Sequence, residues 1–172
     1  MNSDRIKQIF GSYTVDILLQ EAQLRVANLC SQHGQQMICR TLAVTLFSET
    51  LPTALKTADQ QIRAGASIGE TFRDLGFVTH KRNTHWCVAE AGEQFARLTG
   101  GEVNPGSPIA VRLYSLVVEI VGYDAAENEY ATIAEAYHPN HESIRLESPS
   151  CDDDLAMPDK HREALQRLKA AL

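Results

Sequence analysis

Alternating apolar and polar positions mark much of this chain as β-structure. The alternation is clearest over residues 37–47, and residues 13–31 form one long strand or two shorter ones. Successive side chains of a strand point to opposite faces, so this pattern is typical of a strand with one buried face. A later hairpin is expected from strands at 109–121 and 129–137, joined by a turn at 122–128.

Helical periodicity appears in the middle and at the end of the chain. Between residues 51 and 76 the sequence predicts two helices, the first with apolar positions at a period near 3.6. The second begins at Ser67, and Glu70 three residues later would complete a capping box. Residues 158–172 predict a third helix with a leucine stripe. These elements indicate an α+β fold, with a largely antiparallel sheet, helices on one side and an interior ligand pocket.

The expected domain organisation is simple. At 172 residues and 44% hydrophobic content, the chain suits one domain with a sizeable core. Residues 1–140 are expected to form that domain. Residues 141–172 are expected to form an irregular segment and a C-terminal helix, which packs on the domain or on a partner chain. The second arrangement would make a homo-oligomer.

Two arginines stand on strand faces that are otherwise apolar. By alternation, Arg25 shares its face with Ala27, and Arg40 shares its face with Leu42 and Val44. A guanidinium is rarely buried without a partner. Three interpretations remain open for each arginine: it reaches water at a strand end, it pairs with an internal carboxylate, or it grips an anionic ligand in a pocket.

A carboxylate occupies a similar position on a late strand, where Glu135 shares its face with Ala131 and Ile133. Apolar surroundings raise the pKa of a carboxyl group unless a cation lies nearby, and Arg25 and Arg40 are the candidate cations. The three charged residues together would suit a small anionic, partly apolar ligand. A buried structural ion pair explains them equally well.

Composition limits the kinds of partner that the protein is expected to bind. A formal net charge of −6 and a pI near 5.5 argue against a nucleic-acid-binding surface. No apolar run approaches the ~20 residues of a membrane span. His138 and His141 are separated by Pro139, which argues against a helical metal pair, so no metal site is expected.

The N-terminal residues and the cysteines indicate a compartment. The first ten residues lack the apolar segment of a signal peptide, which favours a cytoplasmic protein. The four cysteines contain no C-x-x-C pair. In a cytoplasmic protein they are expected to be reduced thiols.

Four short motifs follow one another along the chain. They are R-x-x-x-L-x-x-x-x-G from Arg25, R-T-x-x-V from Arg40, S-I-G from Ser67, and T-x-A-E-x-x-x-P from Thr132. Together they resemble the chorismate pyruvate-lyases, and more broadly the chorismate-lyase-like fold. The resemblance implies an enzyme that eliminates pyruvate from chorismate to give 4-hydroxybenzoate, without a metal or cofactor.

The resemblance also implies roles for five residues. Arg25 would hold the ligand carboxylate, and Glu135 would meet the hydroxyl end of the ring. The backbone N–H of Ile68 would contact the ligand, Tyr13 would line the pocket, and Arg40 would add positive potential. The same fold also serves as an effector-sensing domain in bacterial transcription regulators, so it does not determine function.

Three functions therefore remain open from the sequence. The first is a carbon–oxygen lyase acting on chorismate. The second is a non-catalytic domain that binds an aromatic or cyclic carboxylate. The third is a structural or assembly protein whose C-terminal helix contacts another chain.

Overall fold

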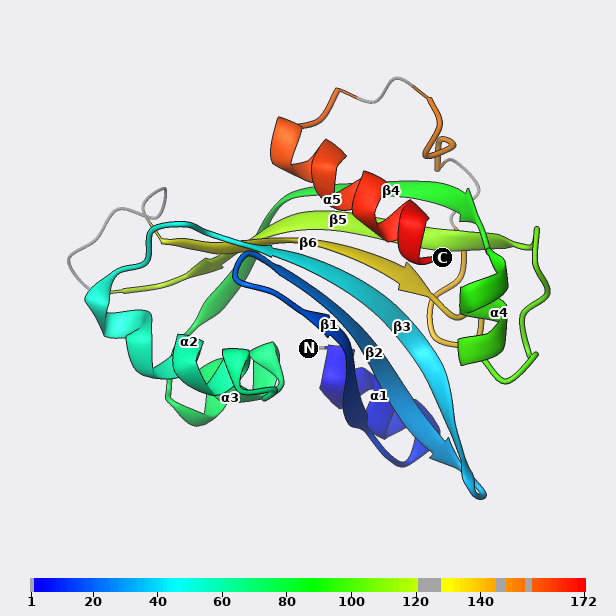
Figure 1. Cartoon of the computed structure of the whole chain (residues 1–172), viewed down its shortest axis with the longest axis horizontal. Helices are drawn as coiled ribbons and strands as arrows, with labels where there is room; N and C mark the ends of the chain where they lie inside the picture. The colour runs from blue at the N-terminus through cyan, green and yellow to red at the C-terminus, as the bar shows by residue number, and fades with distance from the viewer. Residues whose placement is uncertain (1, 121–127, 145–147, 154–155) are drawn as a thin grey trace.

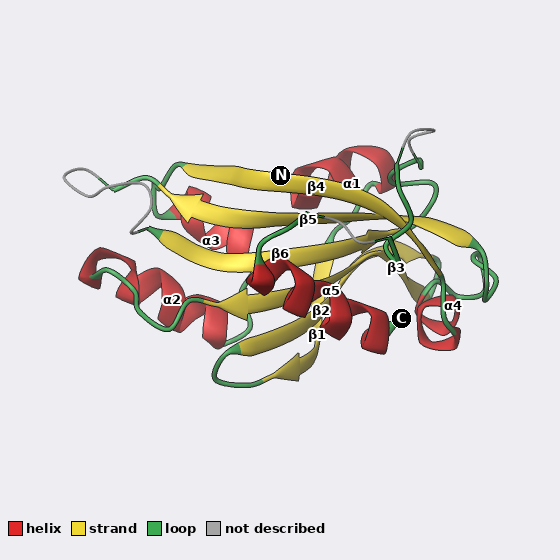
Figure 2. Cartoon of the chain, turned by 90° about the horizontal axis from the view of Figure 1, so that it is seen from above, coloured by secondary structure: helices red, strands yellow, loops and turns green. Residues whose placement is uncertain are grey.

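A six-stranded antiparallel sheet forms the centre of the protein (Figure 1, Figure 2). The computed structural model describes residues 2–120, 128–144, 148–153 and 156–172. The strand order is β1-β2-β3-β6-β5-β4. The strands are β1 Thr14–Gln20, β2 Leu24–His33, β3 Gln36–Phe47, β4 Thr79–Glu90, β5 Pro108–Val118 and β6 Glu129–Tyr137. The predicted turn at 122–128 lies almost entirely outside the described residues.

Short helices connect and cover the strands. They are α1 Asn2–Phe10, the 3-10 helix Thr53–Leu55, α2 Lys56–Arg63, α3 Ile68–Asp74, α4 Glu93–Leu98 and α5 Asp159–Ala171. Figure 1 shows α1, α2 and α3 below the sheet and α5 above it. In the part of the chain that the structure describes, no helix has the length and apolar character to cross a membrane.

The two faces of the sheet carry separate apolar cores. On one face Leu42 and Val44 of β3 pack with Leu165 and Leu168 of α5. On the other face the aromatic strand residues Phe47, Tyr114 and Tyr130 pack with Phe72 of α3 and with apolar residues of α2. The α+β class and the antiparallel sheet are confirmed. The expected grouping of helices on one side holds for α1, α2 and α3 only, because the leucine stripe of α5 covers the second apolar face.

A β-bulge changes the direction of Arg40. The register of β2 and β3 shifts between Leu29 and Cys30, which leaves Arg40 as the extra residue of β3. The guanidinium carbon of Arg40 lies 4.1 Å from the ring centroid of Phe10 in α1. Arg40 therefore points to the face covered by α1, and the prediction that it shares the face of Leu42 was wrong.

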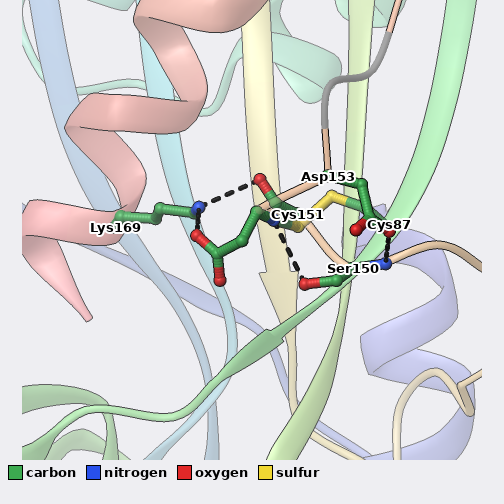
Figure 3. Close-up of a disulfide and its surroundings, with 6 residues drawn as sticks. Cys87, Ser150, Cys151, Asp153 and Lys169 are labelled. Atoms are coloured by element: carbon green, nitrogen blue, oxygen red, sulfur yellow. Dashed lines mark hydrogen bonds and ion pairs between the residues drawn. A yellow bond between two sulfur atoms is a disulfide. The ribbon is translucent and has the colours of Figure 1, made fainter.

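A disulfide connects β4 to the segment before α5. Cys87 and Cys151 are 64 residues apart and joined by an S–S bond of 2.04 Å (Figure 3). Lys169 of α5 donates a hydrogen bond to the Cys151 carbonyl over 3.0 Å. Cys30 and Cys39 are free and buried. The expectation of four reduced thiols was wrong for the disulfide pair, because the fold brings together cysteines that no local spacing connects.

Candidate ligand-binding site

A cavity of about 110 Å³ lies between the sheet and helices α1 and α3. Tyr13, Arg25, Ile68 and Glu135, four of the five residues singled out from the sequence, line it. Lys81, which the sequence did not single out, lines it as well. The structure thus gathers residues from positions far apart in the chain around one hollow.

Small side chains at the centre of the sheet make room for this cavity. Ala27 of β2 and Ala43 of β3 lie directly opposite each other in the antiparallel register. Glu135 of β6 lies opposite Ala43 on its other side. All three line the cavity. Because a methyl group fills little space, two alanines side by side leave a hollow that larger side chains would fill.

Arg25 is buried without a counter-ion. Its side chain is 2% exposed, and Nη1 donates a hydrogen bond to the Ala66 carbonyl over 3.0 Å. Nε and Nη2 have no hydrogen-bond partner among the described residues. Burial lowers the pKa of Arg25, opposed by the phenol groups of Tyr130 and Tyr13. Nε and Nη2 form one edge of the guanidinium, the arrangement that binds a carboxylate through two parallel hydrogen bonds.

The carboxylate of Glu135 is, by contrast, surrounded by donors. Oε1 accepts hydrogen bonds from Asn2 over 2.6 Å and from the Tyr114 hydroxyl over 3.1 Å. Oε2 accepts from Arg112, whose Nη2 and Nε lie at 2.7 and 3.2 Å, and from the Tyr137 hydroxyl. A carboxylate offers about four lone-pair sites. The protein itself therefore occupies the hydrogen-bonding capacity of Glu135.

The cations near Glu135 differ from those expected. Arg112 Nη2 lies 2.7 Å and Lys81 Nζ 3.8 Å from its Oε2. Burial raises the pKa of Glu135, but Lys81, Arg112 and the hydrogen bonds outweigh burial and lower it to about 2. The prediction that Arg25 and Arg40 supply the counter-charge was wrong. Arg112 lies directly opposite Glu135 in the β5–β6 hairpin, so the hairpin register is the signal that would have identified it.

Tyr13 and the start of α3 form one wall of the cavity. The Tyr13 hydroxyl lies 3.1 Å from Ser67 Oγ, and burial raises the pKa of Tyr13 to about 12. Ser67 is the N-cap residue but makes no side-chain cap hydrogen bond. The predicted capping box is absent here because Glu70 accepts a hydrogen bond from Lys7 instead.

Arg40 is a buried arginine outside the cavity lining. Its Nε donates to Ser31 Oγ over 2.8 Å, and its Nη1 donates to Glu102 over 3.1 Å. The Phe10 ring packs on the guanidinium. The side chain is 4% exposed. Arg40 is therefore satisfied by the protein, and the expectation of one polar patch formed by Arg25, Arg40 and Glu135 was wrong.

The two histidines considered as metal ligands take part in local contacts. His138 Nε2 lies 3.2 Å from a Glu102 carboxylate oxygen. His141 Nδ1 lies 3.0 Å from the Thr41 hydroxyl. Within the described ranges, no group of three or more His, Cys, Asp or Glu side chains is arranged to hold a metal ion.

Comparisons with known proteins give a general likeness of shape. No protein-family model matches the sequence, and no curated protein matches it. The C-terminal domain of PhnF superposes with a TM-score of 0.48 at 11% identity, covering 74% of this chain and 84% of that chain. The ligand-binding domain of a proposed GntR-family transcriptional regulator from Bordetella bronchiseptica gives 0.48 at 14% identity, covering 77% and 90%.

A GntR-family transcriptional regulator from Enterococcus faecalis V583 gives a TM-score of 0.45 at 15% identity, covering 80% of this chain and 96% of that chain. Likenesses at this level carry no argument about function. The resemblance to chorismate pyruvate-lyases stays a prediction.

Proposed function

We propose that this domain binds a small organic anion, with Arg25 as the anchor of its acid group. One observation supports this proposal above the others: a buried guanidinium lines a cavity with one edge free of partners among the described residues. An isolated buried charge is destabilising unless something neutralises it. A bound carboxylate would supply both the charge and the two acceptors that Arg25 lacks.

The size and the walls of the cavity limit the ligand. About 110 Å³ is somewhat less than the roughly 150 Å³ of an engineered cavity in another protein that holds benzene. Ala27, Ala43, Ile133 and Phe72 provide apolar walls. Because the cavity is open on one side, a single ring or an acyclic chain of similar size can place its carboxylate on Arg25 while part of the ligand extends toward solvent.

The lyase remains the second candidate function. Its support is that Tyr13, Arg25, Ile68 and Glu135, the residues implied by the resemblance, line one cavity together. Against it stands the carboxylate of Glu135, whose oxygens already accept hydrogen bonds from the protein. Release of pyruvate from chorismate by the purified protein would decide for the lyase.

Two further predictions from the sequence carry less support. An assembly role through the C-terminal helix is weakened because Leu165 and Leu168 of α5 are buried against the same chain's sheet. A cytoplasmic location is weakened by the disulfide between Cys87 and Cys151, since disulfides are rare in cytosolic proteins.

The test compares benzoate with its neutral analogue benzamide. We expect benzoate to bind and benzamide not to bind, because only the carboxylate can neutralise Arg25. At about a hundred times its dissociation constant, benzoate should add about 2.7 kcal/mol of stability. The variant Arg25→Met should lose benzoate binding, measured by titration calorimetry and thermal shift.

The control variant removes a positive charge that lies outside the cavity. Arg82 is an exposed arginine of β4 outside the cavity lining, so Arg82→Met should bind benzoate as the wild type does. Equal affinity of benzoate for the wild type and Arg25→Met would overturn the proposed function.

A further inference from the structure

Lys81 gives the cavity a second cationic group. Its Nζ lies 3.8 Å from Glu135 Oε2 and 4.1 Å from the ring centroid of Tyr114. Among the described residues it makes no hydrogen bond, although an ammonium group has three N–H donors. Its side chain is 33% exposed, so it lies at the open side of the cavity, whereas Arg25 is 2% exposed.

The charges around the cavity do not balance. Arg25, Lys81 and Glu135 line it, for a formal charge of +1, and Arg112 beside Glu135 raises the sum to +2. Arg112 and Glu135 neutralise each other at 2.7 Å, with two guanidinium nitrogens on one carboxylate oxygen. This pairing leaves two positive charges in excess, those of Arg25 and Lys81, at two separate positions.

Glu135 attracts Lys81 as well as Arg112, but it accepts no hydrogen bond from the Lys81 ammonium. Its oxygens already accept hydrogen bonds from Asn2, Tyr114, Arg112 and Tyr137. A separation of 3.8 Å is also beyond hydrogen-bond distance. Burial and the neighbouring Arg112 guanidinium lower the pKa of Lys81 and outweigh the attraction of Glu135.

We propose that the ligand of this cavity carries two acid groups, one held by Arg25 and the other by Lys81. The ligand class is a compact organic dianion, with an apolar body between its acid groups that contacts Ala27, Ala43 and Ile133. This inference rests on the proposed function and deepens it. According to this inference, Lys81 determines whether the protein prefers ligands with two acid groups over ligands with one.

The experiment uses pairs of probes that differ only in the second acid group. Terephthalate is compared with 4-methylbenzoate, and glutarate is compared with pentanoate. In each pair a carboxylate replaces a methyl group, and the rest of the ligand is unchanged. We expect the dianion of at least one pair to bind about tenfold more tightly, the effect of one charge-assisted hydrogen bond, measured by titration calorimetry.

Three variants test whether Lys81 causes the preference for the dianion. Lys81→Met keeps the aliphatic stem and should abolish the preference for the dianion, since only the ammonium is lost. Lys81→Arg should restore most of the preference. Arg82→Met, which removes a neighbouring exposed charge, should keep it and so excludes a general electrostatic effect.

The outcomes separate this inference from the proposed function. Binding of monoanions that depends on Arg25, with no preference for either dianion, would overturn the role of Lys81 and leave the proposed function intact. A preference for dianions that survives in Lys81→Met would also overturn it. Failure of all four probes to bind the wild type would contradict both proposals together.

Discussion

Arg25 and Glu135 line the same cavity and are buried to nearly the same extent, at 2% and 4% exposure, but their charges meet different surroundings. Four side chains donate hydrogen bonds to Glu135, and Arg112 supplies a counter-charge. Arg25 donates to one carbonyl. A buried charge that the protein satisfies contributes to the fold, whereas one left unsatisfied indicates a ligand. This difference predicts opposite responses to mutation at the two positions.

Removal of the Glu135 charge, which the protein already satisfies, should have the largest effect on stability. Glu135→Leu leaves Arg112 without its carboxylate and the Tyr114 and Tyr137 hydroxyls without their acceptor. Loss of one partner of a buried pair costs about 3–5 kcal/mol, so we expect a decrease of that size in the free energy of unfolding, measured by urea denaturation.

The control for this variant is Glu142→Leu. Glu142 pairs with Arg5, whose side chain is 45% exposed. An exposed pair of this kind contributes less than about 1 kcal/mol. Equal losses in the two variants would mean that the donors around Glu135 do not stabilise the fold.

The stabilising effect of the Glu135 charge should also appear in the pH dependence of stability. Glu135 has a pKa of about 2 in the folded protein against 4.5 as its ordinary value. Its folded-state pKa is depressed, so its stabilising contribution is complete above pH 4.5 and is lost as the pH falls toward 2. Glu135→Gln does not titrate. The stability gap between wild type and Glu135→Gln should narrow by about 2 kcal/mol between about pH 6 and about pH 3.

Other carboxylates titrate in both proteins of this comparison and cancel in the gap. Equilibrium urea unfolding at several pH values measures it. A gap that stays constant down to pH 3 would show that Glu135 is not stabilised as an anion in the fold, and it would weaken the contrast with Arg25.

The fold and the inward direction of Arg25 could be predicted from the sequence. Apolar alternation is a local property, so the strands, the antiparallel sheet and the inward direction of Arg25 follow from side-chain parity. The failures arose where parity is interrupted. The bulge at Arg40 adds one residue to β3 and turns the side chain to another face, and nothing in the local sequence signals it.

Pairing across the sheet could be predicted only where the connection is short. Arg112 and Glu135 belong to one hairpin, and a correct register would have paired them. Lys81 reaches the cavity from the first half of an edge strand, where positions 80–84 are all exposed and no apolar pattern marks an inward face. The disulfide between Cys87 and Cys151 spans 64 residues, and chain folding alone brings these cysteines together.

The smallest effect is expected at Arg25, and there the sign is informative. Arg25→Met removes a buried charge without a counter-ion and keeps a side chain of similar reach, so the free energy of unfolding should stay constant or rise by about 1 kcal/mol. Arg40→Met removes a guanidinium that binds Ser31 and Glu102, and it should lose about 1–3 kcal/mol. Urea denaturation without ligand compares the two variants. If Arg25→Met loses as much stability as Arg40→Met, Arg25 serves the fold, and its unsatisfied edge no longer argues for a bound anion.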